Sequence, residues 1–362
     1  MYRATIIRQR IAVPLICVLA SGLAFTQQQR LYLDAGRGRP PFDITRHSIP
    51  IRQIYSGGPP RDGIPALNNP RFVSPSDARR FLDKSDRVLA IDYNGIAKAY
   101  PINILNWHEI VNDDFNGKRV LVTWCPLCLS GIAFDAQLRG RRLTFGVSGK
   151  LYKSNLLMYD RETGSLWSQM LGKAVTGPLT GASLRMVPVE DTTWGYWLTQ
   201  HPNTLILSPK TGYSINYGLD RYAGYRDRGD PIFLDLQDRK TGNGRIRPMQ
   251  RVLGVAIGGI QKAYPFSVLK KNPVRFSDQV GNHTVLIHFD RKSKTAWVTN
   301  ASGDVLPSTT VFWFAWRAFY PKTRVFCGKP CKHYENQCAI GASELMPQLG
   351  PDTLCAAKSA RV

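Results

Sequence analysis

The chain has 362 residues, of which 43% are hydrophobic and 20% are charged, and this composition excludes a largely disordered protein. Lysine and arginine outnumber the acids 48 to 26, which gives a net charge of +22. The basic residues are scattered, and no zinc-finger spacing, RNA-binding fingerprint or basic helix accompanies them, so no specific nucleic-acid partner is predicted. The charge leaves two options, contact with an anionic envelope polymer or membrane surface, or a simply soluble basic protein.

The first 25 residues predict export. Three arginines among the first ten residues precede an uncharged, mostly apolar run over residues 11–25. This run has the length of a secretory signal and is short for a spanning helix, which needs about 20 apolar residues. We interpret residues 1–25 as a signal peptide, with an uncleaved N-terminal anchor as the alternative, and expect a periplasmic or extracellular protein. Residues 26–50 are polar and interrupted by Pro and Gly, which predicts a linker.

An internal repeat dominates the predicted globular region, residues 51–326. The sequence pattern of about residues 87–125 recurs at about residues 251–290, and we name these two stretches the first and the second copy. Each copy is predicted to form a β-hairpin with an Asn-Gly or Gly-Gly turn, then a short helical segment and an apolar strand. The sequence therefore predicts an α+β, β-rich fold in which internally duplicated hairpin-helix-strand units pack as one body.

Two cysteines, Cys125 and Cys128, follow the apolar strand of the first copy. Their spacing brings two sulfurs close enough to form a disulfide or to bind one soft metal ion. The second copy has Asp290 in place of Cys125, and it has Lys271–Pro273 in place of Trp107–Glu109. Because a scaffold element would be expected in both copies, residues confined to the first copy are the better functional candidates.

The chemistry of the cysteine pair has several interpretations. A proline between the two thiols favours dithiol/disulfide exchange, but the residues that follow predict a turn and a strand instead of a thioredoxin-like helix. A c-type haem site requires His directly after the second cysteine, and Leu129 in that position excludes such a site. With His108 as a third ligand, Cys125 and Cys128 would suit Cu(I) or Zn(II). The remaining interpretation is a structural disulfide or two buried thiols.

Two further groups are candidates for binding or catalysis. His108 and Glu109 could act as an acid–base pair beside the cysteines, or they could simply cap a helix end. Ser148, Lys150 and Tyr152 are predicted in a polar loop that could bind an anion through backbone N–H groups. Their spacing is not that of a phosphate-binding loop.

Residues 327–362 differ in composition from the rest and predict a cysteine-containing C-terminal appendage. Its four cysteines are Cys327, Cys331, Cys338 and Cys355. In an exported chain we expect two disulfides among them, with a zinc site that includes His333 as the alternative.

Several motifs taken together resemble the bacterial and archaeal domain-of-unknown-function family numbered 3179. They are Ser56–Pro60, Asp62–Pro65, Lys98–Pro101, Trp107–Glu109, Asn112-Asp113, Cys125–Cys128, Gly146–Leu151, Tyr159–Thr163 and Leu166–Gln169. The resemblance runs from about Ile51 to Phe326 and implies exported or membrane-anchored proteins without an established biochemical role. One departure is Leu129-Ser130-Gly131, where members usually have Gly-Ser-Ala.

Two hypotheses follow. The first is an exported thiol protein in which Cys125 and Cys128, assisted by His108, bind a soft metal or undergo dithiol/disulfide exchange. The second is a non-enzymatic envelope binding module with a structural disulfide and a basic surface. The sequence leaves open whether the protein is an enzyme and which oligomeric state it has.

Overall fold

The computed structural model describes residues 6–8, 30–232 and 246–328. The predicted signal or anchor therefore lies outside the described residues, except for strand β1 (Ile6–Arg8), which pairs with β2 (Leu31–Leu33). In the described part of the chain, no helix is long and apolar enough to cross a bilayer. Cys327 is disulfide-bonded, and the other three cysteines of the appendage lie outside the described residues.

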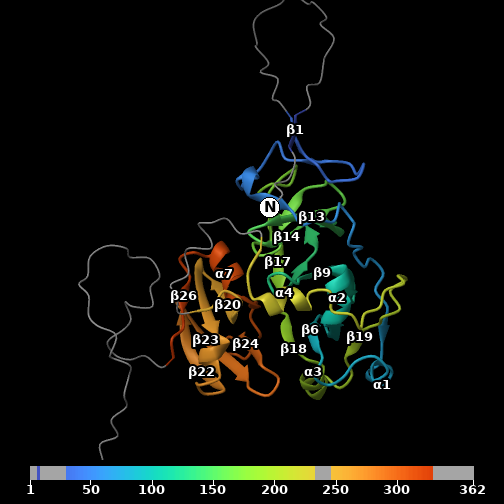
Figure 1. Cartoon of the computed structure of the whole chain (residues 1–362). Helices are drawn as coiled ribbons and strands as arrows, with labels where there is room; N and C mark the ends of the chain where they lie inside the picture. The colour runs from blue at the N-terminus through green and yellow to red at the C-terminus, as the bar shows by residue number, and fades with distance from the viewer. Residues whose placement is uncertain (1–5, 9–29, 233–245, 329–362) are drawn as a thin grey trace, which may run out of the picture.

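The protein is β-rich, as predicted, with 42% strand and 13% helix. Five small sheets form a ring that resembles a five-bladed β-propeller (Figure 1). Hairpins and short connections account for most of these sheets, which explains why turn signals are frequent in the sequence.

The five sheets are as follows. The first contains β18 (Glu190–Thr193), β6 (Arg87–Tyr93), β7 (Ile96–Pro101), β19 (Leu205–Leu207) and β5 (Phe72–Val73). The second contains β17 (Arg185–Val187), β10 (Ser130–Asp135), β9 (Lys118–Cys125) and β8 (Ile110–Phe115). The third contains β16 (Lys173–Ala174), β15 (Leu166–Ser168), β14 (Asn155–Asp160), β13 (Phe145–Tyr152) and β4 (Ile54–Ser56). The fourth contains β25 (Thr309–Phe312), β20 (Arg251–Ile257), β21 (Ile260–Pro265) and β26 (Arg324–Val325), and the fifth contains β22 (Arg275–Val280), β23 (His283–Asp290) and β24 (Thr295–Thr299).

Short elements complete the described chain. They are β3 (Phe42–Asp43), which pairs with β2; the ribbon of β11 (Gln137–Leu138) and β12 (Arg141–Arg142); the one-turn helices η1 (Ile51–Gln53) and α1 (Pro75–Ala78); and α4 (Ala223–Arg228). Ser74 caps α1 by accepting a hydrogen bond from the Asp77 backbone N–H, as a Ser-Pro start predicts.

The two copies of the repeat contain the same elements in the same order. The hairpin β6–β7, helix α2 (Ile102–His108) and strands β8–β10 correspond to β20–β21, α6 (Phe266–Leu269) and β22–β24. The correspondence continues beyond the predicted ends, because β18, α3 (Trp194–Gln200) and β19 match β25, α7 (Trp313–Phe319) and β26. In both, the last strand pairs in parallel with the second strand of the hairpin.

The Lys-Ala-Tyr-Pro motif found in both copies holds neighbouring strands together. Lys98 Nζ lies 2.9 Å from both carboxylate oxygens of the buried Asp113, and the Tyr100 hydroxyl donates to the same carboxylate. In the second copy, Lys262 forms an ion pair with Asp278 at 2.7 Å. In both copies the motif therefore joins the hairpin to the strand that follows α2 or α6. Because the same contact occurs in both copies, we interpret it as a scaffold element.

Strands of the two copies pack against each other and close the ring. Strand β10 lies against β25, and β18 lies against β24, where the hydroxyls of Thr192 and Thr295 are 2.7 Å apart. The Phe312 backbone N–H donates to the Cys128 carbonyl at 2.9 Å. The Arg87 guanidinium donates to the Ser293 carbonyl at 2.7 Å. We refer to these contacts as the seam between the copies.

The glycine- and proline-rich segment Gly57–Pro65 lies along β13. Its Asp62 accepts hydrogen bonds from the Tyr159 hydroxyl at 2.6 Å and from two nitrogens of Arg161. Gly57 N–H donates to the Gly149 carbonyl at 2.8 Å. These contacts explain why a segment unsuited to helix or central strand nevertheless has a fixed conformation.

Candidate dithiol site

Cys125 and Cys128 occupy the turn that connects β9 to β10. Cys125 ends β9 and pairs with Ser130, the first residue of β10. The Cys128 N–H donates to the Cys125 carbonyl at 3.2 Å, and Leu129 adopts a left-handed conformation with φ of 53°. The two cysteines lie 3.7 Å apart, and both are free. The turn therefore brings both thiols to one side of the connection.

Both thiols are buried. Cys125 is 2% exposed and Cys128 is 0% exposed. The Ser154 carbonyl accepts from both sulfurs, at 3.8 and 3.3 Å. Burial, together with the adjacent Cys125 thiol, raises the pKa of Cys128 well above its usual value. Cys128 is therefore a buried, protonated thiol and not an exposed, activated thiolate.

A buried hydrogen-bond network lies beneath the turn. The Gln169 side-chain amide donates to Thr123 Oγ1 at 2.9 Å and to the Ser130 carbonyl at 3.0 Å. Its oxygen accepts from Ser130 Oγ at 2.9 Å and from Asn155 Nδ2 at 2.7 Å. The network fixes the start of β10 and therefore the position of the thiols.

Two tyrosines that sequence reasoning missed lie next to the thiols. Tyr222 and Tyr225 belong to the Tyr-, Gly- and Arg-rich segment 211–230, which contains α4. The Tyr225 hydroxyl donates to the Leu127 carbonyl at 3.0 Å. Burial is the main cause that raises the pKa of both tyrosines, and the next largest contribution comes from Glu109 for Tyr222 and from Cys128 for Tyr225. The segment covers the turn.

The structure does not bring His108 together with the cysteines. Its Nδ1 lies 2.7 Å from the Pro65 carbonyl and its Nε2 lies 2.6 Å from the Tyr217 hydroxyl. Because a carbonyl only accepts, Nδ1 carries the proton, and Nε2 accepts from Tyr217. Burial lowers the pKa of His108, which favours the neutral ring. Among the residues that the structure describes, no three His, Cys, Asp or Glu side chains are grouped to hold a metal ion.

Glu109 lies close to the thiol turn but is not paired with His108. It ends α2 in a left-handed conformation, and its carbonyl accepts from the Trp124 N–H at 2.7 Å. The Tyr222 hydroxyl donates to Glu109 Oε1 at 3.2 Å. Burial raises the pKa of Glu109 to about 7, against the opposing effects of the Tyr222 hydrogen bond and the Arg221 charge. Tyr222 thus binds a carboxyl group whose pKa is about 7.

The raised pKa of Glu109 predicts a stability that depends on pH. Because the folded state holds this proton more tightly than the unfolded chain, the contribution is complete below about pH 4.5 and is lost as pH rises through about 7. The difference between 7 and 4.5, at about 1.4 kcal/mol per pH unit, corresponds to roughly 3 kcal/mol. Glu109→Gln should remove this share of the decline in unfolding free energy between pH 5 and pH 8, as measured by denaturant titration.

Glu190→Gln is the matched variant, because burial raises the pKa of Glu190 to about 7 as well. Each variant should flatten the pH dependence, and the double variant should flatten it further. An unchanged slope in Glu109→Gln would show that this carboxyl ionises normally in the folded protein.

The prediction of a polar loop at Ser148, Lys150 and Tyr152 is wrong, because all three lie in strand β13 and are buried. Ser148 Oγ donates to the Leu157 carbonyl and accepts from the Lys150 N–H at 3.0 Å. These bonds satisfy a bulge that begins after Val147. Burial lowers the pKa of Lys150, opposed by the charge of Asp34. The hydroxyl of Ser148 is therefore committed to the strand.

Fold and site together define a β-propeller-like protein with a buried dithiol at one inter-strand turn. The chain belongs to the family described as Protein of unknown function (DUF3179), whose model matches residues 61–323. No curated protein and no solved structure matches the chain.

Proposed function

We propose that Cys125 and Cys128 form a redox-active dithiol that converts to an intramolecular disulfide, in a protein that acts outside the cytoplasm. The observation that carries the proposal is the 3.7 Å separation of two free cysteines in one turn. A disulfide needs an S–S distance of about 2.05 Å, which side-chain rotation within such a turn can approach.

The reaction is an exchange with a low-molecular-weight disulfide as oxidant. One protein sulfur attacks the small disulfide, and the first small thiol leaves with a proton. The second protein sulfur then attacks the mixed disulfide, and the second small thiol leaves with the other proton. Two S–H bonds and one S–S bond break, and one S–S bond and two S–H bonds form. The burial of both sulfurs and the raised pKa of Cys128 support a slow exchange that favours small oxidants.

A soft monovalent ion is the second candidate. Two thiol donors without a third ligand in the described part of the chain suit Cu(I) better than tetrahedral Zn(II). The non-enzymatic alternative assigns the pair a purely structural role and the basic surface a contact with anionic polymer.

The test is redox titration of the purified full chain in glutathione buffers, followed by alkylation and mass analysis of the peptide that contains both cysteines. That peptide should lose two hydrogen atoms over a defined potential range. Cys125→Ser and Cys128→Ser, each a one-atom exchange, should keep one alkylatable thiol at every potential. A pair that remains fully alkylatable in strongly oxidising buffer would refute the proposal. Retention of copper against a Cu(I) chelator, lost in both variants, would select the metal alternative instead.

A further inference from the structure

The thiol turn has a structural counterpart in the second copy. The turn from β23 to β24 begins at Asp290, which pairs with Thr295 as Cys125 pairs with Ser130. Lys294 is left-handed with a φ of 51°, as Leu129 is with a φ of 53° in the first copy. Residue by residue, Ser293 therefore occupies the place of Cys128. The same position in the fold carries different chemistry in the two copies.

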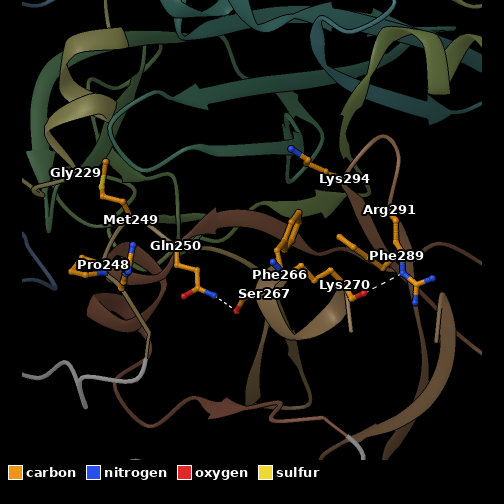
Figure 2. A pocket seen from close by; sticks show the side chains of 11 residues that line it. Gly229, Pro248, Met249, Gln250, Phe266, Ser267, Lys270, Phe289, Arg291 and Lys294 are labelled. Atoms are coloured by element: carbon orange, nitrogen blue, oxygen red, sulfur yellow. Dashed lines mark hydrogen bonds between the residues drawn. The ribbon is translucent and has the colours of Figure 1, made fainter. Parts of the chain in front are cut away.

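The counterpart turn borders an open cavity of about 990 Å³ (Figure 2). In the first copy, the segment that contains Tyr222 and Tyr225 covers the corresponding place. In the second copy, α6 is only four residues long, and the cavity lies between it and the turn. The residues that carry its chemistry are Arg247, Lys270, Arg291, Lys294, Phe266 and Phe289.

The charge of this cavity has one sign. Four cationic side chains line it, and no carboxylate is among the described residues of its lining. Two acids of the same region are paired within the protein: Asp290 accepts from the backbone and hydroxyl of Ser293, and Asp191 forms ion pairs with Arg87 and Arg251. Among the described residues, the lining itself therefore carries positive charge only.

One of the cations is held in place by the backbone. The Arg291 guanidinium donates to the Lys270 carbonyl at 3.2 Å and to the Asn272 carbonyl at 2.7 Å. Neutral carbonyls orient the guanidinium without neutralising it. Figure 2 shows Arg291 and Lys270 at the same side of the cavity, near Phe289.

The cavity also has an apolar part. Phe266 and Phe289 pack edge to face with ring centroids 5.3 Å apart, and Met249 and Pro248 add further apolar surface. An aromatic or aliphatic body can pack against these side chains while an acidic group meets the cations.

We propose that this cavity binds a small amphiphilic anion, in which a phosphate, sulfonate or carboxylate is attached to an aromatic or apolar body. Its volume is in the range of small-molecule pockets, and an extended anionic polymer would not need the apolar surface of Phe266, Phe289 and Met249. The inference does not depend on the dithiol chemistry, because it rests on residues of the second copy.

The probe is anilinonaphthalene sulfonate, which combines an anion with aromatic rings and fluoresces when bound in an apolar site. The double variant Arg247→Glu/Lys270→Glu changes two exposed side chains of the cavity. The control, Arg139→Glu/Arg141→Glu, makes the same charge change at exposed residues of a different cavity. We expect roughly tenfold weaker binding for the first variant and less than about threefold for the control, with circular dichroism unchanged in both.

Competition identifies the chemistry that is recognised. Naphthyl phosphate should displace the probe at lower concentration than naphthol or inorganic phosphate alone, and raising the salt concentration should weaken binding. Equal losses in the two double variants would overturn the site in favour of a general charge effect. Equal competition by naphthol would overturn the anion requirement. Tighter competition by polyphosphate than by naphthyl phosphate would assign the cavity to a polymer instead.

Discussion

Replacing Lys98 by Met is expected to lower the unfolding free energy by about 3–5 kcal/mol. The substitution leaves the buried Asp113 carboxylate without its main counter-charge, while Lys98 and Asp113 side chains are only 7% and 5% exposed. Solvation by water cannot replace the lost ion pair, and the two aromatic rings that flank Lys98, Phe72 and Phe115, offer no hydrogen-bond donor. Denaturant unfolding followed by tryptophan fluorescence measures the loss.

The second copy supplies the control. Lys262→Met removes the equivalent ion pair with Asp278. The side chains of Lys262 and Asp278 are 14% and 18% exposed, so water can partly replace the lost partner. The loss of unfolding free energy should therefore be clearly smaller than for Lys98→Met. Lys98→Met combined with Asp113→Asn should recover part of the loss, because no uncompensated charge remains buried. Equal costs in the two copies, without such recovery, would contradict the explanation.

Gly149→Ala is expected to destabilise the protein by roughly 2–5 kcal/mol, or to prevent folding at elevated temperature. Gly149 has a φ of 73°, and a Cβ atom there would lie 2.0 Å from the Pro59 carbonyl oxygen. The backbone of the Gly57–Pro65 segment would have to move away from β13. Thermal unfolding followed by circular dichroism measures the effect.

Gly164→Ala separates the two causes of this loss. Gly164 has nearly the same φ, 71°, but no atom lies within 4 Å of its added Cβ. Gly164→Ala should therefore lower the unfolding free energy by only roughly 1–2 kcal/mol, which is the cost of placing alanine in the left-handed region. Similar losses at both positions would mean that close packing of the loop on β13 contributes nothing.

The local part of the fold could be predicted from the sequence, whereas the ring could not. Asn94-Gly95 and Gly258-Gly259 mark the two hairpin turns, and alternating or apolar runs mark the strands. The order of the five sheets depends on contacts such as β10 with β25, which join residues almost 180 positions apart and leave no local pattern.

Part of the candidate site followed from comparing the copies, and the rest had no local signal. The asymmetry of the repeat singled out Cys125 and Cys128. Tyr222 and Tyr225 lie about 100 residues later in a segment without periodicity, so only the three-dimensional structure brings them to the thiols. His108 is near the pair in sequence, but its ring nitrogens face Pro65 and Tyr217.

The seam between the copies has a consequence for how the molecule unfolds. The Cys128 carbonyl receives its hydrogen bond from Phe312, and the Ser293 carbonyl receives its own from Arg87, so each copy satisfies a backbone group in the turn of the other. If either copy unfolded alone, a backbone carbonyl in the copy that remains folded would lose its hydrogen-bond donor. The two copies are therefore one cooperative unit, and damage to the scaffold of either copy lowers the population of both turns in their native form.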